Sequence, residues 1–211
     1  MYSSYVAVHL VTHPIAQHAL LRIRNVNTHP SQFRRLAARL SVIIAIEATR
    51  DLATEQRTVD TPLEPATGFS LQHDVVVVPV LRAGLAMAEA VLTLVPDARV
   101  GHVGLQRDEE TALASRYYLK LPAIAATTTV LVVDPMLATG GSAQAALDLV
   151  KAAGGVDVRL LSIVAAPEGV AHVQQTHPDV SIYTTAVDRQ LNAHKYILPG
   201  LGDFGDRLYG T

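Results

Sequence analysis

The stretch VLVVDPMLATGGS, residues 130–142, places an acid, hydroxyl side chains and two adjacent glycines directly after an apolar run. Asp134 ends that run, and Thr139 to Ser142 enter a segment whose pattern predicts a helix. Glycines let a ligand approach the main chain, and the free N–H groups at a helix start favour an anion. The segment therefore suits a phosphate group, and the Asp134 carboxylate suits the hydroxyls of a sugar.

A purely structural interpretation of this loop stays open. In it, Ser142 is the N-cap of an ordinary strand-to-helix turn, and the glycines only allow the chain to turn. The loop has no Gly-Lys-Ser/Thr and no G-x-G-x-x-G, which excludes two common nucleotide-binding motifs. The order of strand, acid, small-residue loop and helix favours a sugar phosphate.

Two arginines and a glycine-rich end add further chemistry. Arg82 follows an apolar run in VLRAG, and its planar guanidinium suits a polyphosphate; the alternative is a surface arginine or one paired with Glu89. Arg107 begins the polar stretch RDEET, whose three acids at 108–110 we interpret as a solvated tip. Residues 199–205 are rich in glycine and expose main-chain N–H and C=O groups, unless they form an irregular tail.

The elements that must position these residues follow from periodicity. Ser31 is expected to cap the first predicted helix. Segments 61–68 and 107–121 have a loose, polar character. Alternating apolar strands and helices indicate an α/β protein with a mainly parallel sheet, in which ligands bind at the carboxyl ends of strands. The pattern predicts helices over 31–49, 84–95, 142–153 and 167–175, and strands over 75–78, 99–105, 130–133, 158–165 and 180–184.

The composition narrows the class of protein. The chain has 211 residues, of which 49% are hydrophobic and 17% charged, and this length predicts one domain over 1–211. The absence of cysteine excludes disulfides, thiolate metal sites and a cysteine nucleophile. With a net charge of −2 and no basic run, we expect no nucleic-acid partner. No apolar run is long enough for a membrane span and no secretory signal is present, so a cytoplasmic protein is expected.

The assembled motifs resemble the type I phosphoribosyltransferases, and within them the uracil phosphoribosyltransferase branch. The loop at 130–142 is similar to the family's loop for 5-phosphoribosyl-1-pyrophosphate (PRPP), with Asp-Pro where other branches carry two acids. The resemblance spans nearly the whole chain, and the PRPP loop together with the Pro-Gly-Leu-Gly-Asp ending is its most specific part. The other matching segments are EATRDL, VPVLRAGLAM, RDEET, VAAPEG, HPDV and YILPGLGDFGDRLYGT.

The resemblance implies a reaction and a set of site residues. Uracil and PRPP would give uridine monophosphate (UMP) and pyrophosphate, on a mainly parallel central sheet flanked by helices, with a β-arm and a small hood formed by the chain ends. Arg82, Arg107 and Asp203 would be catalytic, and the same three would contact PRPP. Uracil would contact Ile197, Gly202, Asp203 and Phe204. The other implied PRPP contacts are Asp134, Pro135, Met136, Leu137, Ala138, Thr139, Gly140, Gly141 and Ser142.

Two departures from the family pattern leave questions open. Gln106 stands where relatives commonly carry Tyr, and Phe204 where they carry a small residue. The Phe204 side chain either points away from the base or narrows the pocket and stacks on it. The resemblance also makes Leu81–Arg82 the candidate for a cis peptide bond that does not involve proline. A general-base role for Asp203 is a further hypothesis, which an Asp203→Asn variant with unchanged turnover would reject.

The resemblance further implies a Mg²⁺ ion carried mainly by PRPP, so no protein metal ligands are named. GTP is a possible activator, and a homodimer or higher homo-oligomer is expected. The histidines, including His9 and His13, are interpreted as surface or core residues rather than a zinc site. The alternative function is a regulatory protein of the same fold that binds PRPP or uridine nucleotide, or RNA as well, without turnover. An inactive binding protein, disabled at positions 106 and 204, is the third hypothesis.

Overall fold

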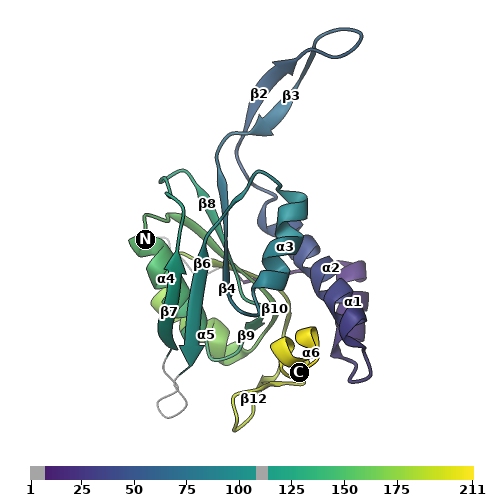
Figure 1. Ribbon diagram of the computed structural model, residues 1–211, viewed down its shortest axis with the longest axis vertical. Helices are drawn as coiled ribbons and strands as arrows, with labels where there is room; N and C mark the ends of the chain where they lie inside the picture. The colour runs from purple at the N-terminus through teal and green to yellow at the C-terminus, as the bar shows by residue number, and fades with distance from the viewer. Residues whose placement is uncertain (1–7, 108–113) are drawn as a thin grey trace.

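A central, mostly parallel sheet fills the middle of the computed structural model, which describes residues 8–107 and 114–211 (Figure 1). Its main strands follow the order β1-β11-β10-β8-β4-β6-β7, in which β6 and β7 are antiparallel and the other neighbours are parallel. Short strands β5 (Arg99–Val100) and β9 (Met136–Leu137) pair with β4 and β10. The expected parallel sheet is therefore confirmed. The seven strands are β1 (Val8–Leu10), β4 (Val75–Leu81), β6 (His102–Arg107), β7 (Ala114–Lys120), β8 (Thr129–Val133), β10 (Asp157–Ala165) and β11 (Ser181–Val187).

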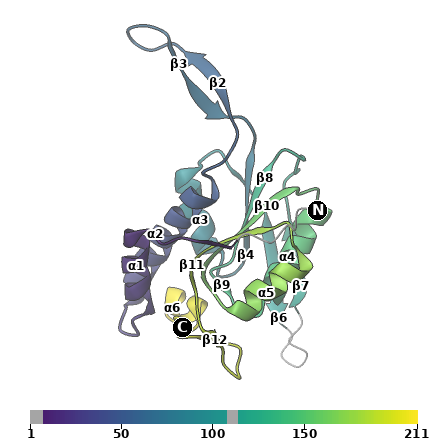
Figure 2. The ribbon, with the colours of Figure 1, turned by 180° about the vertical axis from the view of Figure 1, so that it is seen from behind.

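Successive valines of the central strands build two separate cores. Because side chains alternate across a strand, Val75 and Val77 face one side of the sheet and Val76 and Val78 the other. Helices α1 (Pro14–Arg24), α2 (Pro30–Ala48) and α3 (Leu85–Leu94) cover the first side. Helices α4 (Gly141–Ala152) and α5 (Pro167–Thr176) cover the second, as Figures 1 and 2 show. Burial on both faces explains the continuous apolar runs in the sequence.

Three local predictions are corrected by the structure. Helix α2 begins at Pro30, and the Nδ1 atom of His29, not Ser31, caps it by accepting the Ser31 N–H at 3.3 Å. Helix α4 is preceded by Gly140 at the N-cap position, so Ser142 lies inside the first turn. The predicted strand over 99–105 is interrupted at Gly101, which separates β5 from β6.

A two-stranded hairpin projects from the body of the molecule (Figures 1 and 2). It consists of β2 (Thr54–Val59) and β3 (Ala66–Leu71), paired antiparallel. The segment 61–68, expected to be loose, therefore contributes its last residues to β3. Likewise, 107–121 contains strand β7, whereas the acids at 108–110 lie outside the described residues.

The C-terminal segment packs against helix α1 at the carboxyl edge of the sheet. The guanidinium of Arg24 in α1 donates to the Gly200 carbonyl at 2.7 Å, and Arg207 donates to the Ile23 carbonyl at 2.7 Å. These bonds hold the C-terminal segment against α1, which forms the expected hood. Its elements are β12 (Gln190–Leu191), β13 (Ile197–Leu198) and α6 (Phe204–Tyr209).

Among the helices of residues 8–107 and 114–211, none combines the length and apolar character that spanning a membrane requires.

Candidate active site

The loops after β4 and β8 touch each other at the carboxyl edge of the sheet. These strands are direct neighbours, with Pro79 paired to Val133. Gly84 packs so closely on the Val133 carbonyl that a Cβ atom there would overlap it. The Leu81–Arg82 peptide is cis, as predicted. Arg82 is exposed and, within the described part of the chain, makes no salt bridge with Glu89, so its guanidinium is accessible to a ligand beside the β8 loop.

The loop from β8 to α4 forms a small concavity of about 40 Å³. Gly140 has a φ of 89°, a left-handed conformation that glycine adopts readily, and a Cβ there would lie 2.9 Å from the His172 side chain. Gly169 of α5 packs against the Ala138 carbonyl, where a Cβ would lie 2.5 Å away. Helix α5 therefore packs directly against the loop and fixes its position. The concavity is lined by Asp134, Met136, Leu137, Ala138, Thr139, Gly140, Ser142 and Ala143.

The remaining two predicted loop residues have structural positions. Pro135 is buried, and its carbonyl accepts the N–H groups of Ile163 and Val164 at 3.0 and 3.1 Å. Gly141 is the first residue of α4. Both fix the path of the loop rather than line the concavity.

Asp134 occupies the base of this loop in an unusual electrostatic environment. Burial raises the pKa of its carboxyl group to about 7, an effect that a hydrogen bond from the Met136 N–H at 3.5 Å only partly opposes. In the described residues, the carboxylate has no salt bridge to a basic side chain. A desolvated carboxylate of this kind gains strongly from hydroxyl donors, which suits a ribose.

The glycine-rich C-terminal loop is tied to the sheet by one ion pair. Arg24 forms a bidentate pair with Asp188 at 2.7 Å, and Asp188 also accepts the Gly200 N–H at 2.8 Å. Gly200 has a φ of 58° and packs against the Ile197 carbonyl, so a larger residue would clash there. These contacts fix the backbone that follows, including Gly202 and Asp203.

A second cavity, of about 240 Å³, lies between this C-terminal loop and the phosphate-suited loop. It shares Met136 and Ala138 with the smaller concavity, so the two cavities are adjacent. The structure thus brings the four predicted base-contacting residues opposite the predicted PRPP loop. The lining residues are Met136, Ala138, His194, Lys195, Tyr196, Ile197, Gly202, Asp203 and Phe204.

The orientation of Phe204 resolves one open question. The residue as a whole is 2% exposed, and its ring packs edge-to-face on Phe33 of α2, with centroids 5.2 Å apart. The side chain therefore belongs to the hydrophobic core. The carboxylate Oδ1 of Asp203 accepts the Asp206 N–H at 2.9 Å and caps α6.

Some residues of the cavity were not predicted from the sequence, and the side chain of one predicted residue lies outside the part of the chain that the structure describes. His194, Lys195 and Tyr196 also line the 240 Å³ cavity, although none was predicted to contact the base. Tyr196 begins the family-like segment YILPGLGDFGDRLYGT, whereas His194 and Lys195 precede it and follow no motif. Arg107 is the last residue of β6, and its side chain lies outside the described residues. Gln106, which precedes it, is exposed.

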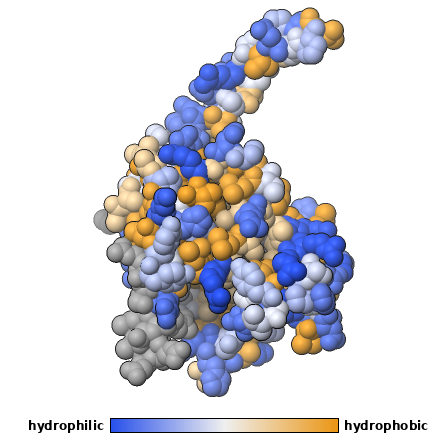
Figure 3. Space-filling view, in the orientation of Figure 1, coloured by the Kyte–Doolittle hydropathy of each residue, from blue (hydrophilic) through white to orange (hydrophobic). Residues whose placement is uncertain are grey.

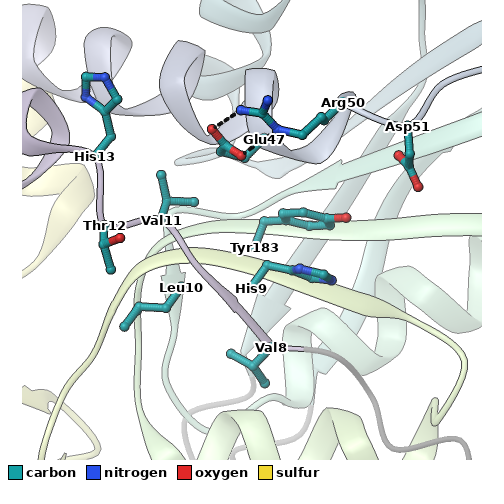
Figure 4. A pocket seen from close by; sticks show the side chains of 10 residues that line it. All are labelled: Val8, His9, Leu10, Val11, Thr12, His13, Glu47, Arg50, Asp51 and Tyr183. Carbon is teal, nitrogen blue, oxygen red and sulfur yellow. Dashed lines mark hydrogen bonds and ion pairs between the residues drawn. The ribbon is translucent and has the colours of Figure 1, made fainter.

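A larger cavity, of about 680 Å³, lies elsewhere, between strand β1 and the C-terminal end of α2 (Figure 4). His9 stacks on Tyr183 in its wall, with ring centroids 4.4 Å apart, and His13 caps α1. None of the predicted site residues lines it. Over residues 8–107 and 114–211, no group of three His, Cys, Asp or Glu side chains is placed to hold a metal ion.

Comparisons with known proteins show which family the chain matches. The profile of the uracil phosphoribosyltransferase family matches residues 10–211. The uracil phosphoribosyltransferases of Symbiobacterium thermophilum and Dictyoglomus thermophilum are 51% and 50% identical to this chain over 203 residues, covering 96% of it and 97% and 98% of theirs.

Solved structures show the same architecture. A protein from Aquifex aeolicus is 36% identical and superposes with a TM-score of 0.91, covering 98% of this chain and 99% of its own. A hypoxanthine-guanine phosphoribosyltransferase from Bacillus anthracis, 13% identical, covers 76% of this chain and 79% of its own with a TM-score of 0.50, a likeness of fold alone.

Proposed function

Since the chain belongs to the uracil phosphoribosyltransferase family, we propose that the two adjacent cavities described above form the site where it joins uracil to PRPP. The chain is a pentosyltransferase that forms UMP and pyrophosphate in pyrimidine salvage. One observation carries the assignment of the site. The loop suited to a sugar phosphate and the glycine-rich C-terminal loop share the walls formed by Met136 and Ala138.

The PRPP loop holds the substrate by its phosphate and its ribose. Residues 138–142 surround the 5-phosphate with main-chain N–H groups and hydroxyls at the start of α4. Asp134 accepts hydrogen bonds from the ribose hydroxyls. Support comes from the left-handed Gly140, which turns the chain at this point, and from the desolvated state of the Asp134 carboxyl.

Arg82 and Arg107 bind the pyrophosphate group as it leaves. The N1 atom of uracil supplies the electron pair of the new bond to the anomeric carbon and loses its proton to solvent, while the bond to pyrophosphate breaks with its pair on the departing oxygen. Negative charge grows on pyrophosphate during this step, and guanidinium groups stabilise it. Support for Arg82 is its exposed position on the loop that contacts Val133.

Uracil is selected mainly by main-chain groups. Gly202 to Phe204 and Ile197 present N–H and C=O groups to the base, a pattern that cytosine would leave partly unpaired. The inward orientation of the Phe204 ring supports this assignment because it leaves only the backbone of that residue at the cavity. Asp203 also contacts PRPP.

A Mg²⁺ ion would enter with PRPP. The described residues near the loop offer one carboxylate, Asp134, which fits an ion held mainly by substrate oxygens and water. The ion supplies neutralising charge for the diphosphate. The protein's own contribution is to fix the two substrates with the reacting atoms in line.

Regulation and assembly belong to the same proposal. GTP activates the enzyme, and the chain forms a homodimer or a higher homo-oligomer within one domain over 1–211. Family resemblance supports the GTP effect. Exposed apolar side chains support self-association: Phe69 on the projecting hairpin is 79% exposed, and apolar residues gather on the body below it (Figure 3). The expected cytoplasmic location stays a prediction.

The test is formation of UMP from uracil, PRPP and Mg²⁺, with cytosine and hypoxanthine in parallel and with or without GTP. Product from uracil alone supports the assigned base site. An Arg82→Ala variant should lose at least about a hundredfold in kcat while the protein stays folded. Normal turnover by that variant would contradict the assigned site, and a mass measurement in solution checks the oligomer.

A further inference from the structure

Lys195 has a backbone conformation that sets it apart among the described residues. Its φ is 65°, and within residues 8–107 and 114–211 it is the non-glycine residue with a positive φ. Side chains with a Cβ atom disfavour this left-handed region. Asn192 holds the turn: its carbonyl accepts the Lys195 N–H at 2.9 Å, and its Oδ1 accepts the N–H groups of His194 and Tyr196 at 3.0 and 2.9 Å. The turn is therefore built to keep residue 195 in one place.

Lys195 lies between strands β12 and β13, in the wall of the 240 Å³ cavity beside the PRPP loop. Lys195 lines it opposite Met136 and Ala138 of the PRPP loop. Within the described residues, the Lys195 ammonium has no salt bridge. The pKa of the Glu168 carboxyl is lowered mainly by a hydrogen bond from the Leu191 N–H and to a smaller extent by the positive charge of Lys195. Glu168 accepts that Leu191 N–H at 2.9 Å, which anchors the β12 strand to α5. Lys195 is thus an exposed basic residue in the wall of the base site, and among the described residues it forms no salt bridge.

We propose that Lys195 is a further base-binding residue, whose ammonium donates a hydrogen bond to a carbonyl oxygen of uracil. The inference rests on the proposed base site. An ammonium group has donors only, so it pairs with a carbonyl oxygen and is repelled by an amino group at the same position. Lys195 therefore adds a side-chain contact to a base site otherwise formed by main-chain groups.

The same contact assists the reaction. As the N1 atom of uracil forms its bond to the anomeric carbon, its proton leaves to solvent and the C–O bond to pyrophosphate breaks with its electron pair on pyrophosphate. Loss of the N1 proton shifts electron density onto the ring carbonyl oxygens, and a cation at one of them stabilises that charge. The benefit is largest for a base whose N–H is weakly acidic. It is smaller for 5-fluorouracil, whose fluorine already draws charge from the ring.

Four variants test the role. Lys195→Met removes the charge and keeps the length and the strained backbone, whereas Lys195→Gly removes the charge and relieves the strain. Lys195→Arg keeps the charge. Lys151→Met is the control, since Lys151 lies on α4 and pairs with Asp179 away from the cavity. Each variant is assayed for kcat/KM with uracil and with 5-fluorouracil, for the KM of PRPP, and for its melting temperature.

The expected result is a loss of about tenfold or more in kcat/KM for uracil in both Lys195→Met and Lys195→Gly, with a smaller loss for 5-fluorouracil. The KM of PRPP stays unchanged, and Lys195→Arg recovers most of the activity. Equal losses for both bases, or wild-type kinetics in Lys195→Met, would overturn the inference. Absence of UMP formation by the unaltered protein would contradict the proposed function, whereas the variant results above contradict only the role of Lys195. The two failures are therefore distinguishable.

Discussion

Replacing Asp134 by Asn should change how the stability of the protein depends on pH. The folded protein holds the Asp134 proton up to a pKa of about 7, whereas the unfolded chain releases it near the ordinary value of 3.8. Between these values the folded state binds more protons, so the free energy of unfolding falls as pH rises. The whole window corresponds to about 4 kcal/mol, of which about 3 kcal/mol lies between pH 5 and pH 8. Asn at this position does not titrate and removes that dependence.

The assay is guanidinium-induced unfolding of the wild type and the Asp134→Asn variant at pH 5, 6, 7 and 8 without substrates. Other titrating groups contribute equally to both proteins, so the difference between the two free energies isolates Asp134. The variant should gain about 3 kcal/mol over the wild type as the pH rises from 5 to 8. Parallel pH profiles for the two proteins would refute the argument that this carboxyl is desolvated.

The same substitution connects stability to substrate binding. If ribose hydroxyls donate to the ionised carboxylate, PRPP binding favours the charged form and releases a proton at neutral pH. Calorimetry in buffers of different ionisation enthalpy measures that release. Asp134→Asn should abolish it and weaken PRPP binding by about tenfold or more.

Three further variants probe the supports of the site. Phe204→Ala should lower the free energy of unfolding by about 3–5 kcal/mol because it empties a core position, and it should reduce the preference for uracil over cytosine in kinetic assays because the packing of this ring fixes the main-chain groups at 202–204. Gly140→Ala should weaken PRPP binding at least about tenfold by direct titration, because φ is 89° and a Cβ would lie 2.9 Å from a histidine side chain. Gly68→Ala, on the projecting hairpin, is its control, since a Cβ there would meet no atom within 4 Å, and it should bind normally. Arg24→Ala leaves Asp188 without its ion pair, which should cost about 3 kcal/mol in unfolding experiments and raise the KM of uracil.

Local patterns predicted the parts of this fold that are buried on both sides. The valine runs of β4 and β8 are apolar without interruption, and each ends at a residue that breaks the pattern. The PRPP loop is contiguous in sequence, so its acid, glycines and hydroxyls were visible together. The cis peptide at Leu81–Arg82 followed from the resemblance alone, because no local property of those two residues requires it.

Elements without a buried face gave no comparable signal. Strand β2 reads TEQRTV and is almost wholly exposed, so neither apolar alternation nor an apolar run marks it. Its strand structure comes from pairing with β3, a contact that the sequence pattern does not encode. His29 illustrates a second limit: an imidazole nitrogen capped α2 where the usual preference pointed to the serine two residues later.

The sequence predicted the base site only at its glycine-rich loop, where the composition is unusual. The glycines at 200 and 202 signalled an exposed backbone, but the residues facing that backbone come from a turn whose position depends on Asn192 and on the anchoring of β12 to α5. The orientation of Phe204 likewise depended on Phe33, which is far away in sequence and supplies the ring it packs against.

The inward position of the Phe204 ring has a consequence for base selection. If the ring lined the cavity, uracil would be held by stacking, and stacking discriminates poorly between uracil and cytosine because both present a similar flat face. With the ring in the core, packing on Phe33 fixes the first turn of α6 and thereby the main-chain groups at 202–204. Selectivity then depends on the positions of donors and acceptors, which a rigid backbone defines well. A bulky residue at this position is therefore compatible with a selective uracil site because it stabilises the backbone that recognises the base.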